Sequence, residues 1–292
     1  MSFSSDQEAR LEPADEIFTI RPAPADEAQP PRLWHNLVTS SGAKRLIIIT
    51  ALLGLWQSYS SWLNYELLLP SPLATLRALA EGFLHGTLPS RLATSLGMLL
   101  SGYAIGIALA GAMTALAMSS RWGRELLATL TAMFNPLPAI ALLPLAMLWF
   151  GLGTPSMLFV LAHAVLWPVA LNTLAGFEGV SPTLRMVGRN YGLSGPRYVL
   201  LILMPAAFPS LLTGLKIGWA FAWRTLIAAE LVFGVSAGSG GLGWYIYENK
   251  NQLEIPAVFA GLSTVIVIGL AVEYLIFKTI EQRTVRRWGM QS

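Results

Sequence analysis

The sequence predicts an all-α membrane protein of about six transmembrane helices. Its 292 residues are 54% hydrophobic and 12% charged, whereas soluble proteins are roughly 45–50% apolar and about 25% charged. The apolar residues form long stretches separated by short charged segments, as expected for helices that satisfy their own backbone hydrogen bonds in lipid. The 19 Lys and Arg residues also divide unequally between alternate loops, which favours an even number of spans.

Residues 1–43 differ in composition from the rest of the chain. Acidic residues alternate with prolines there, and no apolar period is sustained. This composition predicts a disordered acidic and proline-rich cytoplasmic tail. The tail lacks the basic segment followed by an apolar segment that is typical of a signal peptide. We therefore expect a membrane domain over residues 44–292.

The first predicted span covers about residues 46–66 and follows Lys44-Arg45. Ser71-Pro72 is typical of a helix cap with proline in the first turn, so a short amphipathic helix is expected over about 72–85. The second span, about 94–118, carries small residues that allow helix backbones to approach closely in lipid; these are Gly97, Gly102, Gly106 and Gly111.

The third predicted span, about 126–150, contains Asn135-Pro136, Pro138 and Pro144. Proline removes a backbone donor, so a broken or kinked helix is expected there. Three further spans are predicted at about 156–177, 205–233 and 256–278.

The orientation follows from the distribution of basic residues. With the tail in the cytoplasm, three of the basic residues fall on the outer side, namely Arg77, Arg91 and Lys250, and two lie inside the fifth span. The other 14 fall on the cytoplasmic side. The positive-inside rule therefore predicts six spans with both termini cytoplasmic.

The polar segment 181–204 separates the fourth and fifth spans. Ser181 can cap a helix with Pro182 in its first turn, and Gly192 can supply the left-handed residue that ends it. Ser194 and Pro196 can begin a second short helix. A cytoplasmic helix-turn-helix is therefore expected between two membrane helices.

This segment resembles the coupling loop of binding-protein-dependent ABC importer permeases, whose pattern is EAA, three residues, Gly, nine residues, Ile, one residue, Leu-Pro. Gly192, Ile202 and Pro205 match, and Met204 replaces the Leu. The EAA positions hold Met186-Val187-Gly188 and depart from the pattern. Residues 134–153, 192–232 and 241–247 also look like the nitrate, sulfonate and taurine branch, and the whole resemblance covers about residues 70–288.

The resemblance implies an ATP-driven importer of the bacterial inner membrane. Two separate ATPase subunits would dock at residues 182–204, a periplasmic or lipid-tethered solute-binding protein would dock outside, and two copies of the permease would form a homodimer. The solute would be a small anion such as a sulfonate, taurine or nitrate. ATP and Mg²⁺ would bind to the partner ATPase, with no cofactor on this chain.

The sequence carries no ATPase site of its own. No Lys is directly preceded by Gly, so the GxxxxGK[ST] phosphate loop is absent. The glycine-rich run at residues 238–243 precedes no Lys, and we interpret it as a flexible loop or a re-entrant turn on the outer face. ATP, if used, must be hydrolysed by another chain.

Ionisable residues inside a span cost about 2.5–3.5 kcal/mol on insertion scales, so they are candidates for function. Lys216, Trp223 and Glu230 fall within about 40° of one another on one face of the fifth span, and Arg224 lies on a neighbouring face. These four residues are the candidate translocation pathway. Lys216 could instead snorkel to the interface, and Glu230 or Glu273 could serve helix packing or pair with a cation, including Arg224.

His163, in the fourth span, is expected to make a hydrogen-bonded helix contact. No pattern of His or carboxylates indicates a metal site or a catalytic centre. An ATP-independent secondary transporter or channel is the alternative function, although we see no internal repeat. A membrane enzyme would need a cluster of catalytic side chains near one face, which the sequence lacks.

Overall fold

The computed structural model describes residues 41–233 and 240–286, and every regular element in these ranges is a helix. Four of the described helices are long and apolar enough to cross a membrane, and six spans result if each of two bent pairs counts as one. The predicted all-α membrane fold is thus confirmed. The chain divides at Gly54 into two units, and the predicted tail lies outside the described residues except for its last three positions.

Helix α2 (Ser41–Leu63) forms the first span and ends three residues before the predicted limit of about residue 66. Within the second unit, its final turns are tied to the following loop, because Trp56 Nε1 donates to the Pro70 carbonyl at 3.0 Å and Ser60 Oγ donates to the Leu69 carbonyl at 2.9 Å. Ser71 caps α3 (Pro72–Leu84) by accepting the Ala74 N–H. The expected short helix after Ser71-Pro72 is confirmed.

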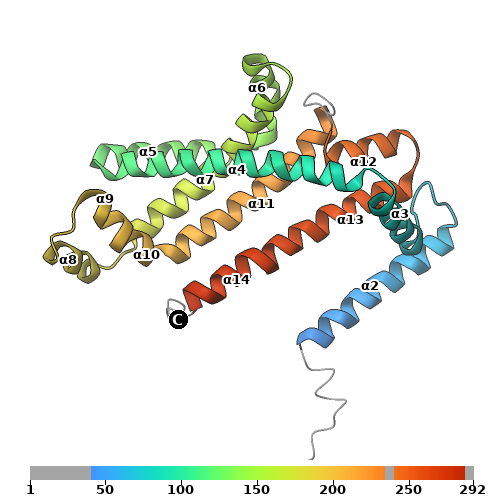
Figure 1. The fold of residues 1–292 in the computed structure, drawn as a ribbon, viewed down its shortest axis with the longest axis horizontal. Helices are drawn as coiled ribbons and strands as arrows, with labels where there is room; N and C mark the ends of the chain where they lie inside the picture. The colour runs from blue at the N-terminus through green and yellow to red at the C-terminus, as the bar shows by residue number, and fades with distance from the viewer. Residues whose placement is uncertain (1–40, 234–239, 287–292) are drawn as a thin grey trace, which may run out of the picture. The chain divides into compact units, whose positions relative to one another are not determined.

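Helices α4 (Leu88–Met118), α7 (Thr154–Glu178) and α11 (Phe208–Phe233) lie side by side and form the centre of the second unit (Figure 1). A Cβ at Gly102 would lie 2.5 Å from Leu161 Cβ, and one at Gly106 would lie 2.6 Å from Val165 Cβ. Both glycines therefore permit close contact between α4 and α7. No atom lies within 4 Å of the Cβ position at Gly97 or Gly111.

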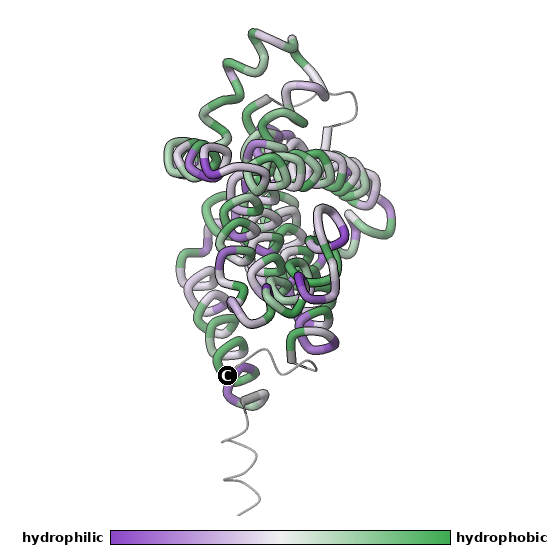
Figure 2. The backbone as a smooth tube through the Cα atoms, turned by 90° about the vertical axis from the view of Figure 1, so that its left-hand side faces the viewer, coloured by the Kyte–Doolittle hydropathy of each residue, from purple (hydrophilic) through white to green (hydrophobic). Residues whose placement is uncertain are grey.

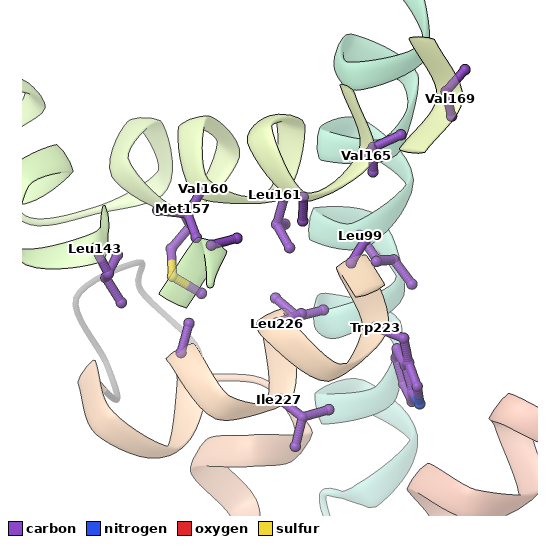
Figure 3. Packing of buried hydrophobic residues seen from close by; sticks show 14 of the residues in the cluster. Leu99, Leu143, Met157, Val160, Leu161, Val165, Val169, Trp223, Leu226 and Ile227 are labelled. Carbon is purple, nitrogen blue, oxygen red and sulfur yellow. The ribbon is translucent and has the colours of Figure 1, made fainter. Parts of the chain in front are cut away.

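The interior of this centre is apolar. Leu99 of α4, Leu161 and Val165 of α7, and Leu226 of α11 point into a shared cluster (Figure 3) and are almost fully buried. Burying such a side chain contributes about 1.5–3 kcal/mol in water, but lipid is itself apolar, so close packing is the larger contribution here.

The third predicted span is broken as expected. Helix α5 (Arg121–Phe134) ends before Asn135-Pro136, and the chain resumes with η1 (Ala139–Leu142) and α6 (Leu143–Phe150). The two parts are bent by 89°. Pro136 and Pro138 lack the N–H groups that a continuous helix requires.

After α7 the chain forms α8 (Pro182–Asn190), α9 (Gly195–Tyr198), η2 (Val199–Leu203) and α10 (Met204–Ala206), and a 78° bend separates this segment from α11. The expected helix-turn-helix is confirmed.

Figure 2 shows mostly apolar residues along the chain, with strongly hydrophilic residues in short stretches.

The sequence did not predict α12 (Leu242–Asn251), which precedes the last span. Gly243 lies in its first turn and Gly241 immediately precedes it, so these glycines belong to a helix start rather than to a flexible loop. Gly238 lies outside the described residues. The sixth span comprises α13 (Ile255–Ala271), η4 (Val272–Phe277), α14 (Lys278–Glu281) and η5 (Gln282–Arg286).

Candidate functional site

The loop between α7 and α11 is held to the end of α7 by two side chains. Ser181 Oγ accepts the Leu184 N–H at 3.3 Å and so caps α8. Arg185 donates from Nε to the Val180 carbonyl at 3.0 Å, and its guanidinium also donates to the Phe177 carbonyl. The Phe177 carbonyl also accepts the Val180 N–H at 3.4 Å. Because both carbonyls lie at the end of α7 or just after it, the bonds from Arg185 fix the direction in which α8 leaves the membrane helix.

Gly192 ends α8 in a left-handed conformation with φ +70°. The Gly192 N–H donates to the Arg189 carbonyl at 2.9 Å, and the Leu193 N–H donates to the Gly188 carbonyl at 3.0 Å. These two bonds form the Schellman motif that terminates many helices. The predicted conformational role of Gly192 is therefore present.

Gly188 occupies the third EAA position and is buried. A Cβ there would lie 2.8 Å from Tyr198 Cε2 and 3.0 Å from Ile202 Cγ1. The absence of a side chain lets α8 pack directly against the segment that carries Ile202. The motif residues Gly188 and Ile202 thus meet across the turn.

The first two EAA positions point away from this contact. The side chains of Met186 and Val187 are 56% and 40% exposed, and Tyr191, at the end of α8, is 81% exposed. Met204 and Pro205 lie in α10, immediately before the bend into α11. Three exposed apolar side chains thus lie along α8 beside the exposed Arg189 and Asn190. We call Met186, Val187 and Tyr191 the α8 surface.

Three of the four candidate pathway residues are engaged by neighbouring helices. Lys216 Nζ lies 2.6 Å from a Glu281 carboxylate oxygen and 3.9 Å from one of Glu273. Trp223 is buried, and its Nε1 donates to the Val265 carbonyl of α13 at 3.3 Å. The face shared by Lys216, Trp223 and Glu230 is therefore directed toward other parts of the chain.

Glu230 is 6% exposed and joins three helices. Both of its carboxylate oxygens lie 2.8 Å from Ser95 Oγ of α4, and Oε2 accepts the Gly243 N–H of α12 at 2.8 Å. Ser95 Oγ also accepts the Leu242 N–H at 2.8 Å. We call these groups the Glu230 network; it satisfies the first N–H groups of α12, which have no helical partner.

The glycines of α12 allow this approach. A Cβ at Gly241 would lie 2.1 Å from Glu230 Oε1, and one at Gly243 would lie 2.6 Å from Glu230 Cβ. No local pattern indicated Ser95 as a partner of Glu230, because the two residues are far apart along the chain. The glycine-rich run was the available signal for a close backbone approach.

Arg224 lies on the other side of α11, where it is exposed. Its guanidinium carbon is 5.9 Å from the centre of the Phe221 ring. Glu230 bonds to Ser95 and Gly243, and Glu273 lies near Lys216; within the described residues no carboxylate forms an ion pair with Arg224. Of the four candidates, Arg224 is the one whose charged group remains available.

Arg224 borders a cavity of about 360 Å³ between the break after α5, helix α7 and helix α11. We call it the Arg224 cavity; its wall includes Phe134, His163, Trp167 and Phe221. The Phe134 and Trp167 rings are stacked with centres 5.2 Å apart, and His163 contacts both rings. The expectation of a hydrogen-bonded His163 was wrong, because neither ring nitrogen has a partner among the described residues.

In the described ranges, no group of three His or acidic residues could hold a metal ion. Two other features stand out in the described residues. The loop before α11 carries the α8 surface, and farther along α11 the Arg224 cavity is bordered by a guanidinium that forms no ion pair with a described carboxylate. Such features suit docking and solute passage, not bond-making chemistry.

The comparisons with known proteins identify the family. The family described as "Binding-protein-dependent transport system inner membrane component" matches residues 102–286. The taurine transport system permease protein TauC of Escherichia coli is 30% identical over 239 residues, covering 77% of this chain and 82% of that protein. The nitrate import permease protein NrtB of a Synechocystis species is 30% identical over 239 residues, covering 79% and 85%.

The matched region contains the whole loop 181–204, all four candidate pathway residues and the last span. The resemblance to the nitrate, sulfonate and taurine branch is confirmed, and the alternatives of a secondary transporter, a channel or a membrane enzyme are set aside. The chain belongs to the family of multi-pass inner-membrane permeases of binding-protein-dependent ABC importers, which carry no cofactor and work with a separate ATPase and a solute-binding protein.

Proposed function

We propose that this permease imports a small anion as a homodimer, and that each copy receives an ATPase subunit on the loop 181–204. The observation that carries the proposal is the α8 surface: three apolar side chains exposed on a helix whose angle is fixed by Arg185 and Gly192. Exposed apolar side chains on a rigid support are typical of protein interfaces. Residues 186–188, 192, 202, 204 and 205 would form the coupling site.

The rigidity of the loop suits the transmission of movement. Arg185 ties α8 to the end of α7, and Gly188 packs against the segment leading to α11. A force applied to α8 would therefore act on both membrane helices at once. A flexible loop of the same length would absorb such a displacement.

The docking proposal is tested by replacing Met186 and Val187 with Glu. Two charges on the α8 surface should lower affinity for the ATPase subunit by about 10-fold or more, because interface centres tolerate unpaired charge poorly. The measurement is co-purification and binding of the ATPase subunit to the permease in detergent. Leu253→Glu, at an exposed residue after α12, is the matched control and should bind the ATPase normally; wild-type affinity in the double variant would contradict the proposal.

The anion proposal rests on Arg224 and on the relatives named for taurine and nitrate transport. A permanent cation that lacks a carboxylate partner attracts anions in a low-dielectric setting. Proteoliposomes holding the permease, its ATPase subunit and ATP, with the solute-binding protein outside, should accumulate taurine, an alkanesulfonate or nitrate. Uptake that proceeds without ATP, or that is confined to neutral solutes, would contradict the proposal.

The homodimer is proposed because Arg224 is exposed on α11 and the described part of the chain does not cover it. Two copies facing each other would place two such cavities along one route. Native mass spectrometry of the purified complex should show two permease chains with two ATPase subunits. A complex with a single 31.6 kDa permease chain that still transports would overturn this assembly.

A further inference from the structure

We propose that the Arg224 cavity is a subsite for the permeating solute and that it selects an organic anion, with an acidic group on Arg224 and an apolar body against the aromatic rings. This inference rests on the proposed import function and names the solute class. The cavity volume of about 360 Å³ lies at the small end of the range of roughly 300–1,000 Å³ typical of ligand sites. It therefore suits a solute with few heavy atoms.

Two side chains of the wall carry buried polar atoms without a partner in the described part of the chain. The nitrogens of His163 and Nε1 of Trp167 are buried and have no hydrogen-bond partner among the described residues. Leaving a buried donor unpaired costs about 1–3 kcal/mol, so these atoms mark a polar side of the wall. The exposed guanidinium of Arg224 is the group that can donate directly to an oxyanion in the cavity. No Asp or Glu borders the cavity, so no acidic side chain competes for Arg224.

The apolar part of the wall indicates the body of the solute. The stacked rings of Phe134 and Trp167 are tilted by 15°, and Phe221 lies beside the guanidinium. Flat rings interact well with a planar or hydrocarbon group. An inorganic ion such as nitrate would satisfy the donors but leave this surface without a partner, so a sulfonate or carboxylate with a hydrocarbon body fits better.

The broken third span accounts for the position of the cavity. Pro136 and Pro138 border it, and the backbone between α5 and η1 is not helical. In membrane proteins, irregular backbone is tolerated where it faces protein or an aqueous path. The break, the Arg224 guanidinium and the rings therefore border one cavity.

The test is direct binding to the permease with its ATPase subunit, in phosphatidylcholine nanodiscs without the solute-binding protein. Saturation-transfer NMR titrations follow the protons of benzenesulfonate and methanesulfonate, and nitrate, which has no protons, is measured by its competition with benzenesulfonate. Benzenesulfonate should bind most tightly and nitrate most weakly. Equal affinity for nitrate and benzenesulfonate, or no binding of benzenesulfonate, would overturn the inference.

Variants separate the two halves of the site. Arg224→Gln should weaken both sulfonates by about 10- to 100-fold, as expected for the loss of a hydrogen-bonded charge, whereas Arg224→Lys should lose less. Phe134→Leu should weaken benzenesulfonate and leave methanesulfonate unchanged. Arg77→Gln, which removes an exposed Arg of α3, is the control and should bind like the wild type.

The unfolding temperature of each variant shows whether the protein is intact, and Arg224→Lys preserves the charge if Arg224→Gln unfolds. Wild-type affinity in Arg224→Gln would refute the subsite even if ATP-driven anion uptake is observed. Conversely, the predicted binding order without uptake of any anion by the complete system would refute the proposed import while leaving the subsite in place.

Discussion

At the residue scale, Gly192, Gly243 and Glu230 have structural roles that their chemistry alone does not indicate. Gly192 supplies a left-handed conformation, and no atom lies within 4 Å of the place where its Cβ would be. Gly243 instead permits contact, because its Cβ would collide with Glu230. One position thus requires backbone freedom and the other requires space.

Replacing Gly192 with Val should uncouple transport from ATP hydrolysis while the protein still inserts and folds. A β-branched residue in the left-handed region costs about 1–3 kcal/mol, enough to change the turn after α8. The measurement is solute uptake per ATP hydrolysed in proteoliposomes. Gly192→Asn is the control, because Asn tolerates this conformation; equal coupling in the Val variant and the wild type would contradict the prediction.

Replacing Glu230 with Ala should destabilise the protein by about 1–3 kcal/mol, since the Gly243 N–H and the Ser95 hydroxyl lose their buried acceptor. Glu230→Gln keeps one acceptor oxygen and should lose less. Thermal unfolding of the purified permease measures both. In the double variant with Ser95→Ala the two losses should not add, because the residues share one network; strict additivity would show that the network is not a unit.

At the scale of elements, charged residues join the end of the last span to α11. Lys216 has its strongest contact with Glu281 of α14 and a longer one with Glu273 of η4. Its side chain is 24% exposed and that of Glu281 is 23% exposed, so the described part of the chain covers most of the pair. This arrangement supports a packing role for Lys216.

A double-mutant cycle should detect this pair. Lys216→Met combined with Glu281→Gln should give a coupling energy of about 1 kcal/mol, which is typical of a partly screened ion pair. The same cycle with Glu273→Gln should give a smaller value because of the longer distance. Unfolding in denaturant monitors both cycles, and a larger coupling to Glu273 would reverse the assignment.

At the scale of the whole molecule, α11 separates the loop 181–204 from helix α12. Its 26 residues span about 39 Å at 1.5 Å per residue, more than the roughly 30 Å of the hydrocarbon layer. The loop 181–204 and helix α12 therefore belong on opposite sides of the membrane. The distribution of Lys and Arg predicts that the loop lies on the cytoplasmic side.

Labelling of single cysteines should confirm this orientation, and the chain contains no native Cys that would interfere. Thr183→Cys in α8 should react with a membrane-impermeant maleimide in inverted vesicles and not in intact spheroplasts. Asn251→Cys, at the end of α12, should show the opposite pattern. Both residues are exposed; labelling of both from the same side would contradict six spans with cytoplasmic termini.

The sequence by itself determined the membrane class, the broken third span, the capped helix-turn-helix and the family. These follow from signals that are local along the chain: apolar length, proline positions, caps and the spacing of Gly192, Ile202 and Pro205. Helical periodicity also placed Lys216, Trp223 and Glu230 on one face.

Only the tertiary structure decided what that face contacts. The partners of Glu230 are Ser95 and the start of α12, and those of Lys216 lie in the last span; periodicity assigns a side chain to a face but not a neighbour to that face. Likewise, the sequence did not predict α12, because the glycines at its start are typical of a loop. In the structure, Gly241 and Gly243 instead leave space for Glu230. The Arg224 cavity depends on how α7 and α11 pack against the break after α5, a contact among residues distant in sequence that no local pattern records.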